Sequence, residues 1–164
     1  MLGLDPGTAS LGFAILGNTG SSWQAVVFDC LHTTKDQPMP ERVLDLYQAL
    51  RRIVRKYRPD AIACEQLFFN KNVRTALSVG AIIGVITLLS AQERIPLFTY
   101  TPLQVKMAIV GYGRATKTQV QKSLTLLLAL AEDPRQDDAA DALAVALCHT
   151  HSLHLRRLLE ASDV

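Results

Sequence analysis

The sequence has few of the residues that would indicate a disulfide-stabilised chain or a thiolate metal site. It contains three cysteines, Cys30, Cys64 and Cys148, which are widely spaced and form no C-x-x-C pair. An odd, scattered set of this kind is typical of buried thiols in a reducing compartment rather than of a disulfide framework or a zinc site. We therefore expect a cytoplasmic protein whose cysteines are small core residues.

An excess of charge of one sign is also lacking, since 17 Lys and Arg oppose 15 Asp and Glu. This balance neither requires nor excludes a polyanionic partner. Asp5 comes too early for the apolar segment of a signal peptide, and the most apolar run, residues 78–91, is too short to span a bilayer. No membrane segment is expected. Apolar residues make up 49% of the 164, enough for one domain with a substantial core.

Turn residues and hydrophobic periodicity divide the chain into elements. Apolar segments at 1–5, 11–18 and 23–33 are separated by tight turns, which predicts an antiparallel meander. A helix ending at Pro59 follows, and solvent exposure explains its basic face best. The remaining expected elements are strands over 60–65 and 95–100, a helix from about 73 to 94, and three helices after residue 100.

The last three helices have recognisable ends. Thr101-Pro102 opens one that Gly111 stops, a second covers 116–130, and Asp133-Pro134 with Gln136 caps the third. A meander followed by alternating helices and strands predicts an α/β fold. We expect a five-stranded mixed sheet with helices on both faces.

Several carboxylates near the start of the last helix are not explained by helix stability alone. Asp138 and Asp141 lie three residues apart and share a helix face that continues into the apolar Ala142 and Val145. The helix dipole stabilises an acid at this end by about 0.3–1 kcal/mol, which accounts for Asp137 as an exposed residue. It does not account for acids facing the core, because burying unpaired carboxylates costs several kcal/mol.

Asp5 and Glu65 end two of the predicted strands. If these strands are parallel neighbours, both carboxylates emerge at the same edge of the sheet. Each acid alone is compatible with an ordinary turn, but four acids at such positions suggest one site. Mg²⁺ and Mn²⁺ take oxygen ligands, and a pair of ions can clamp both the attacking and the leaving oxygen of a phosphodiester. We therefore predict that Asp5, Glu65, Asp138 and Asp141 hold two such ions.

Four blocks of the sequence resemble one known family. They are GLDPGTASLGFAI (3–15), IACEQLFFNKN (62–72), QVKMAIVGYGRATKTQVQ (104–121) and DDAADALAVALCH (137–149). In this order and spacing they are similar to the RuvC-type Holliday junction resolvases of bacteria. The resemblance reaches about residue 151, which predicts a nuclease domain over 1–151 and a C-terminal tail over 152–164. It implies a ribonuclease H-like fold, a homodimer, and paired Mg²⁺- or Mn²⁺-dependent nicks in four-way junction DNA during recombination and repair. The RuvA–RuvB branch-migration complex is an implied further partner.

The resemblance also implies roles for particular residues. The acidic motif of the family falls on Asp5, Glu65, Asp138 and Asp141, and its basic positions fall on Lys106 and Lys117, of which Lys117 assists catalysis. Whether Asp137 contributes to metal binding stays open. The DNA-contacting candidates are Phe68, Phe69, Lys71, Arg74, Lys106, Arg114, Lys117 and Lys122. One of the two phenylalanines would stack on a base as a wedge, whereas Arg74, Arg114 and Lys122 are equally well explained as ordinary surface.

Two further features bear on assembly and metal binding. Gly80 and Gly84 would let another helix approach, either within the chain or, as two matched nicks favour, across a two-fold dimer. His149 and His151 point different ways on a helix, so a metal site with His154 is disfavoured.

Two other functions stay open from the residues alone. The turn Asp5-Pro6-Gly7-Thr8 also suits a nucleotide phosphotransferase of the actin and sugar-kinase superfold, although such enzymes need two lobes and this chain has room for one. The other is a junction-binding module without activity, which the intact acidic set disfavours.

Overall fold

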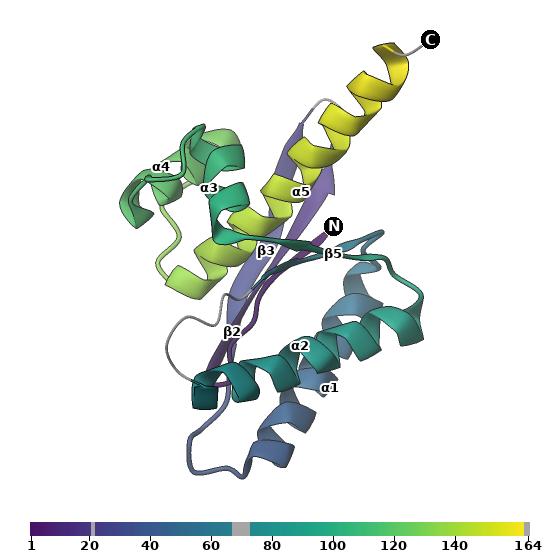
Figure 1. Ribbon diagram of the computed structural model, residues 1–164, viewed down its shortest axis with the longest axis vertical. Helices are drawn as coiled ribbons and strands as arrows, with labels where there is room; N and C mark the ends of the chain where they lie inside the picture. Colours follow the sequence, from purple (N-terminus) through teal and green to yellow (C-terminus); the bar gives the residue numbers. More distant parts are fainter. Residues whose placement is uncertain (21, 67–72, 163–164) are drawn as a thin grey trace.

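The computed structural model describes residues 1–20, 22–66 and 73–162, with the side chains of 73–75 and 154–162 left out (Figure 1). In chain order the elements are β1 (Leu2–Asp5), β2 (Ser10–Asn18), β3 (Trp23–His32), α1 (Met39–Tyr57), β4 (Ile62–Glu65), α2 (Val73–Glu93), β5 (Leu97–Tyr100), α3 (Pro102–Val110), α4 (Lys117–Leu127) and α5 (Asp137–Ser162).

The strands form a single mixed sheet in the order β3-β2-β1-β4-β5. β1, β2 and β3 make the predicted antiparallel meander, whereas β4 lies parallel to β1 and β5 lies parallel to β4. Leu4 of β1 is in register with Cys64 of β4, so Asp5 and Glu65 leave the sheet next to each other. The predicted five-stranded mixed sheet is confirmed.

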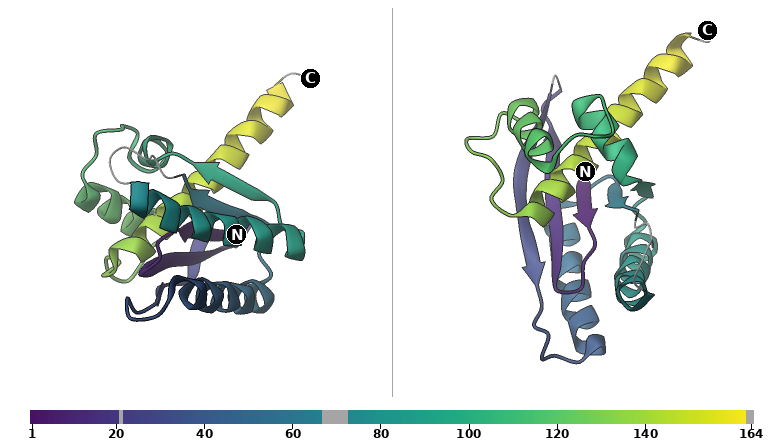
Figure 2. Two further views of the ribbon diagram at one scale, coloured as in Figure 1. Left: turned by 60° about the horizontal axis from the view of Figure 1, so that its bottom comes forward. Right: turned by 60° about the vertical axis from the view of Figure 1, so that its left-hand side comes forward.

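Helices cover both faces of this sheet, as expected. α1 and α2 lie together on one face, whereas α5 crosses the other, with α3 and α4 beside it (Figures 1 and 2). Leu2 and Leu4 of β1 point to the first face and pack in one core with Leu50 of α1 and Ile82 of α2. Each leucine buried in this way contributes roughly 1.5–3 kcal/mol. A second core lies between the sheet and α5.

Small residues bring α5 unusually close to the sheet. Ala140, Ala142 and Ala144 of α5 are buried against the strands. Opposite them the strands carry glycine: a Cβ atom on Gly3 would overlap the carbonyl oxygen of Ala142, and one on Gly12 would overlap that of Asp138. Because side chains are absent at these contacts, the first turns of α5 rest directly on β1 and β2.

The predicted start and end of α3 and the predicted start of α4 are confirmed. Thr101 and Gln104 form a reciprocal capping box at the start of α3, and Gly111 ends that helix with a left-handed φ of 83°. Thr116 and Gln119 form a second capping box at the start of α4. These caps fix the direction in which α4 approaches α5.

The predicted start of the last helix is wrong. α5 begins at Asp137 and not after Asp133-Pro134. The Asp133 carboxylate instead accepts a hydrogen bond from the Thr125 hydroxyl of α4, so it ties the α4–α5 connection together rather than capping a helix. α4 also ends at Leu127, earlier than expected. At the other end, α5 continues to Ser162, through residues that sequence analysis assigned to a tail.

α2 is more apolar than a helix packed on one face needs to be. By length and composition its segment Ala76–Glu93 could cross a membrane, which corrects the expectation that this run is too short, and only 28% of it is buried. Four positions on its outer face, Leu77, Ala81, Gly84 and Leu88, are exposed and recur at helical spacing. We call these four residues the α2 stripe.

Candidate active site

Asp5 and Glu65 stand at the carboxyl ends of the two central parallel strands. Apolar neighbours bury the preceding residues of both strands, and each acid is the first residue that is partly exposed. The predicted meeting of the two carboxylates at one sheet edge is therefore confirmed by the register of β1 and β4. This edge is where α5 begins.

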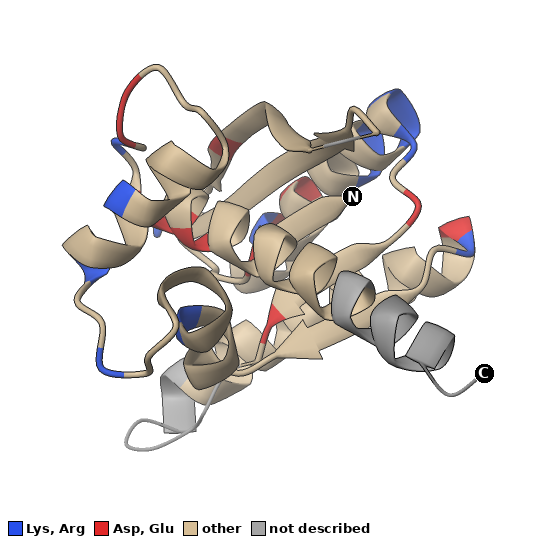
Figure 3. Ribbon diagram, turned by 90° about the horizontal axis from the view of Figure 1, so that it is seen from above, with Lys and Arg blue, Asp and Glu red and all other residues tan. Residues whose placement is uncertain are grey.

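Asp138 and Asp141 reach the same edge from α5. In Figure 3 acidic residues gather at the start of this helix. The close contact between Gly12 and the backbone of Asp138 sets the first turn of α5 against β2. Asp138 is partly buried, whereas Asp137 is exposed with 63% of its side chain accessible. The prediction that Asp137 is exposed, whereas Asp138 lies on the helix face that leads into the core, is therefore confirmed.

The electrostatics show that the four carboxylates act on one another. Burial is the largest cause of a raised pKa at Asp5, which reaches about 8. The other three acids of the cluster raise it further, in the order Glu65, Asp141 and Asp138. Burial also raises the pKa of Glu65, and the charge of Asp141 adds to this, although a hydrogen bond with Asp5 lowers it. Without a cation, Asp5 holds a proton at neutral pH.

Lys117 supplies a positive charge at the exposed end of the cluster. Its Nζ lies 3.1 Å from Oδ2 of Asp141 and 3.3 Å from Oδ2 of Asp137. The Gln121 side chain, one turn further along α4, donates a hydrogen bond of 3.1 Å to Oδ1 of Asp137. Partial burial lowers the pKa of Lys117, but its bonds to Asp141 and Asp137 outweigh this and raise it overall. Burial nevertheless keeps the pKa of Asp141 raised.

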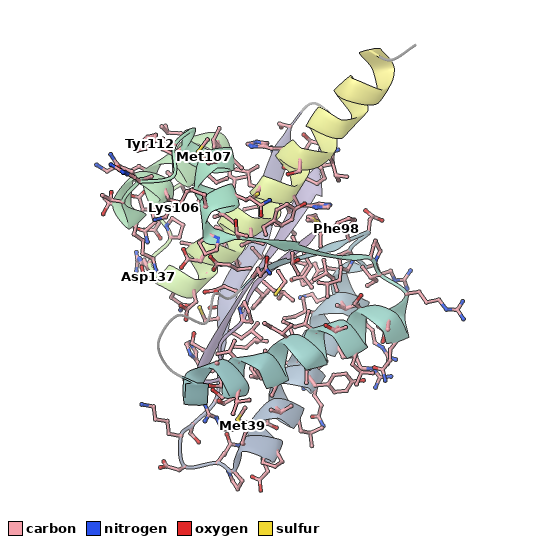
Figure 4. The ribbon with its side chains drawn as sticks, viewed as in Figure 1. Met39, Phe98, Lys106, Met107, Tyr112 and Asp137 are labelled. Carbon is pink, nitrogen blue, oxygen red and sulfur yellow. The ribbon has the colours of Figure 1, made fainter. Side chains whose placement is uncertain are left out.

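A small cavity of about 200 Å³ opens beside these residues. Its polar lining comes from Glu65, Lys106, Lys117 and Asp141, and its apolar lining includes Pro102 and Val120. Lys106 of α3 and Asp137 at the start of α5 lie on the same side of the molecule (Figure 4). The structure thus brings both predicted lysines, Lys106 and Lys117, next to the carboxylates.

The donor set fits a hard divalent cation in its chemistry. All four acids offer oxygen, and the raised pKa of Asp5 and Glu65 shows an excess of negative charge that a cation would relieve. Among the described residues, however, no three Asp, Glu, His or Cys side chains lie close enough together to hold an ion as they stand. Binding would require the carboxylates to move closer together, and a bound ion would compete with Lys117 for Asp141.

The other predicted DNA-contacting residues either lie outside the cavity lining or fall outside the described residues. Arg114 and Lys122 are exposed, before and within α4, and do not line the cavity. Phe68, Phe69 and Lys71 lie outside the described residues, as does the side chain of Arg74, whose backbone belongs to the first turn of α2.

His149 and His151 make contacts with different segments of the chain. His149 is buried, with Nδ1 2.7 Å from the Tyr100 hydroxyl and its ring against Phe98. His151 is exposed, and its Nδ1 lies 3.1 Å from the carbonyl oxygen of Ala108. The expectation that these two side chains point different ways is confirmed.

Sequence reasoning missed two parts of this arrangement. Gly3 and Gly12 were not singled out, although glycine inside a strand signals close backbone approach. The interaction of Asp137 with Lys117 and Gln121 was also missed. Lysine and glutamine four residues apart share a helix face, but only the tertiary structure brings that face to Asp137.

A mixed five-stranded sheet with acids at the carboxyl ends of its central parallel strands, completed by acids on a helix packed against it, defines a nuclease of the ribonuclease H-like class. Residues 1–149 match the family model described as crossover junction endodeoxyribonuclease RuvC. The RuvC proteins of Desulforamulus reducens and Desulfitobacterium hafniense are 49% and 47% identical to this chain, over 91% and 94% of both sequences. The chain therefore belongs to the RuvC family.

The solved structures agree with this assignment. Thermus thermophilus RuvC, in complex with a Holliday junction substrate, is 31% identical and matches with a TM-score of 0.89 over 94% of both chains. The chain is thus a metal-dependent endodeoxyribonuclease that resolves Holliday junctions in recombination and repair. As an enzyme acting on DNA, it works in the aqueous phase rather than in a membrane. The comparisons give no support to a phosphotransferase or to a junction-binding module without activity.

Proposed function

We propose that Asp5, Glu65, Asp138 and Asp141 bind two Mg²⁺ or Mn²⁺ ions at the scissile phosphate. The observation that carries this proposal is the raised pKa of Asp5, about 8, which arises from burial and from the other three carboxylates together. When bound, such ions would activate the attacking water and stabilise the charge on the leaving oxygen. The charges of all three other acids raise the pKa of Asp5, so Asp5 would be a ligand that both ions can share.

The two lysines of the cavity would act on the DNA phosphate. Lys106 and Lys117 line the same hollow as Glu65 and Asp141, so a phosphate in that hollow would meet positive charge beside the carboxylates. Lys117 would assist catalysis as charge develops in the transition state. Asp137 would position it, because Asp137 is itself held by Gln121 and pairs with the Lys117 ammonium.

The remaining DNA contacts rest on the resemblance and on exposure. Arg114 and Lys122 are exposed basic residues near the cavity-bearing helices α3 and α4, where they would meet phosphates of a junction arm. Phe68 or Phe69 would be the wedge at the junction centre, with Lys71 and Arg74 as neighbouring phosphate contacts.

A homodimer would place two such sites on one junction. The α2 stripe supports this, because Leu77 and Leu88 are 72% and 52% exposed on a helix with little charge. Among the described residues, nothing beyond the helix's own backbone and adjoining residues lies within 4 Å of where a Cβ of Gly80 or Gly84 would stand, so packing between described parts of the chain does not explain them. A two-fold interface along α2 would cover this apolar surface.

We further infer that residues 1–151 act as the nuclease domain, with 152–164 as an appended tail, in the cytoplasm and alongside a RuvA–RuvB complex. These three points rest on the resemblance.

Electron paramagnetic resonance of added Mn²⁺ tests the metal proposal without relying on cleavage. Two Mn²⁺ ions about 3.5–4 Å apart would give an exchange-coupled signal on the protein–junction complex. Asp5→Asn should abolish the coupled signal, whereas Asp29→Asn, an exposed acid on β3, should preserve it. A single uncoupled ion in the wild-type complex would overturn the two-ion proposal.

A further inference from the structure

A second basic surface lies at the end of the molecule away from the carboxylates. α1 leads into the start of β4, and α2 ends before the start of β5, so both helix C-termini stand at the sheet edge opposite Asp5 and Glu65 (Figure 1). The cations at this end are Arg51, Arg52, Arg55, Lys56, Arg58 and Arg94. In the same segments, 51–60 and 93–95, the acids are Asp60 and Glu93. The nuclease site makes no use of this charge.

The arginines of this surface are only partly neutralised. Nε atoms of Arg51 and Arg55 both lie 3.4 Å from the same oxygen, Oε1 of Glu93, so two guanidinium groups share one carboxylate. The side chain of Arg55 remains 59% exposed. Guanidinium groups with free donors match the geometry of further carboxylates.

Two residues of this surface occupy backbone conformations that do not favour arginine. Arg58 follows α1 with a φ of 44°, and Arg94 follows α2 with a φ of 55°. Glycine is the usual residue at such left-handed helix ends because a Cβ atom is unfavourable there. Local backbone stability therefore does not favour arginine at either position.

These side chains surround a hollow with an apolar floor. A depression of about 490 Å³ is lined by Val54, Arg55, Arg58, Pro59, Glu93 and Ile95. Val54 and Pro59 are buried, and Ile95 is partly buried, so the base is apolar whereas Arg55 and Arg58 are exposed at its rim. A DNA backbone would use the arginines but has no group for the apolar floor. A peptide with carboxylates and one apolar side chain would use both.

We propose that this hollow binds a short acidic segment of a partner protein. One apolar side chain of the segment lies on the floor formed by Val54, Pro59 and Ile95, and its carboxylates pair with Arg55 and Arg58. Because the hollow is at the opposite sheet edge from the carboxylates, the segment can bind while a junction occupies the nuclease site. The surface thus offers an attachment point for a partner during resolution.

Selection of a random peptide library displayed on phage against the full chain tests the proposal. We expect enriched sequences that combine several acids with an apolar residue. Fluorescence anisotropy of a synthesised, labelled winner should show at least tenfold weaker binding to Arg55→Glu/Arg58→Glu. The matched control, Lys35→Glu/Arg135→Glu, reverses two exposed charges elsewhere and should change binding less than twofold. Enrichment without acids, or equal binding to both double variants, overturns the proposal.

A third variant guards against misfolding, and a cleavage assay excludes DNA as the occupant. Arg58→Gly removes the guanidinium but relieves the left-handed backbone, so Tm should rise by about 2–4 °C while peptide binding weakens. Unchanged peptide binding by Arg58→Gly contradicts the proposal. Junction nicking by Arg55→Glu/Arg58→Glu should stay within twofold of wild type. A matching loss of nicking, with duplex DNA displacing the peptide, would instead assign the surface to DNA.

Discussion

The ammonium nitrogen of Lys117 lies 3.1 Å from a carboxylate oxygen of Asp141. One of the four acids at the sheet edge is therefore paired with a cation of the protein itself, whereas no cation among the described residues forms an ion pair with the partly buried Asp5 and Glu65. A divalent ion held by these acids would compete with Lys117 for Asp141. The ammonium would then lie beside a phosphate held at the same site.

Removing the ammonium should slow chemistry more than binding. For Lys117→Met we expect single-turnover nicking of a four-way junction to fall by roughly 10²-fold, the usual loss when one preorganised charge at a reacting group is removed. Junction affinity in EDTA should change only a few-fold, because many phosphates contribute to it. Lys35→Met, at an exposed lysine that does not line the cavity, is the control and should nick at nearly the wild-type rate. Equal losses in the two variants would contradict the role given to Lys117.

Asp137 should act only through Lys117. Because this ion pair is exposed, we expect Asp137→Asn to reduce the nicking rate modestly, by about 3–10-fold. Asp137→Glu should recover most of that loss. In a Lys117→Met background the same Asp137→Asn change should have no further effect, since the group it positions is gone. Additive losses in the double variant would show that Asp137 acts independently, for example as a metal ligand.

The stability of the metal-free protein should fall as pH rises. Asp5 has a folded-state pKa of about 8, far above the ordinary value near 3.8, so between these pH values the folded state binds a proton that the unfolded state has lost. Its stabilising effect is complete below pH 4 and disappears as pH rises through 8. Asp5→Asn should therefore raise the free energy of unfolding in EDTA by on the order of 3 kcal/mol at pH 8, and by little at pH 4.

Denaturant unfolding at both pH values measures this difference. Asp29→Asn, at an exposed acid on β3, is the matched control and should show no such pH-dependent gain. If Asp5→Asn were equally stabilising at pH 4 and pH 8, its effect would not come from ionisation of Asp5. That result would contradict the claim that burial and the neighbouring carboxylates raise the pKa of Asp5.

Contact between α5 and β2 should tolerate no side chain at residue 12. A methyl group in Gly12→Ala would overlap the carbonyl oxygen of Asp138, so the first turn of α5 would have to move. We expect a loss of more than about 2 kcal/mol in stability and a severe loss of nicking. Gly17→Ala, on the same strand, meets only the tip of the Val26 side chain and should cost less than about 1 kcal/mol. Normal nicking by Gly12→Ala would contradict the positioning role of this contact.

Charge on the α2 stripe should separate the subunits of the proposed dimer. We expect Leu77→Glu/Leu88→Glu to sediment as a monomer in analytical ultracentrifugation, because two carboxylates per chain would be buried at the interface. Leu126→Glu, at an 82% exposed leucine on α4, should leave the dimer intact. A stripe variant that stays dimeric would place the interface elsewhere.

Most of the fold was predictable from local patterns. The meander, the buried strand ending at Glu65, the capped start of α3 and the start of α4 follow from short-range periodicity and turn chemistry, and all are confirmed. The start of α5 was mispredicted because Asp133, Pro134 and Gln136 look like a helix cap. In the structure a tertiary hydrogen bond from Thr125 takes the Asp133 carboxylate, and no sequence pattern reveals that competition.

The site was predictable in its acids but not in its contacts. The positions of Asp5 and Glu65 at strand ends, and of Asp138 on a helix face, were enough to predict that these acids share one site. Both features depend on backbone geometry alone. The pairing of Lys117 with Asp137 depends on how α4 packs against α5, which local propensity does not determine. The importance of Gly3 and Gly12 was also not predictable from local propensity. A side chain at either position would overlap the backbone of α5, a segment distant in the sequence.

Cleavage of a labelled mobile four-way junction, compared with a linear duplex of the same sequence, tests the central claim most directly. The reactions would contain Mg²⁺, Mn²⁺ or EDTA, with wild type and Asp141→Asn side by side. We predict paired, symmetric nicks in the junction alone, lost in EDTA and in Asp141→Asn, while the variant still binds the junction. Wild-type rates of nicking by Asp141→Asn, or equally fast cutting of the duplex, would contradict the account.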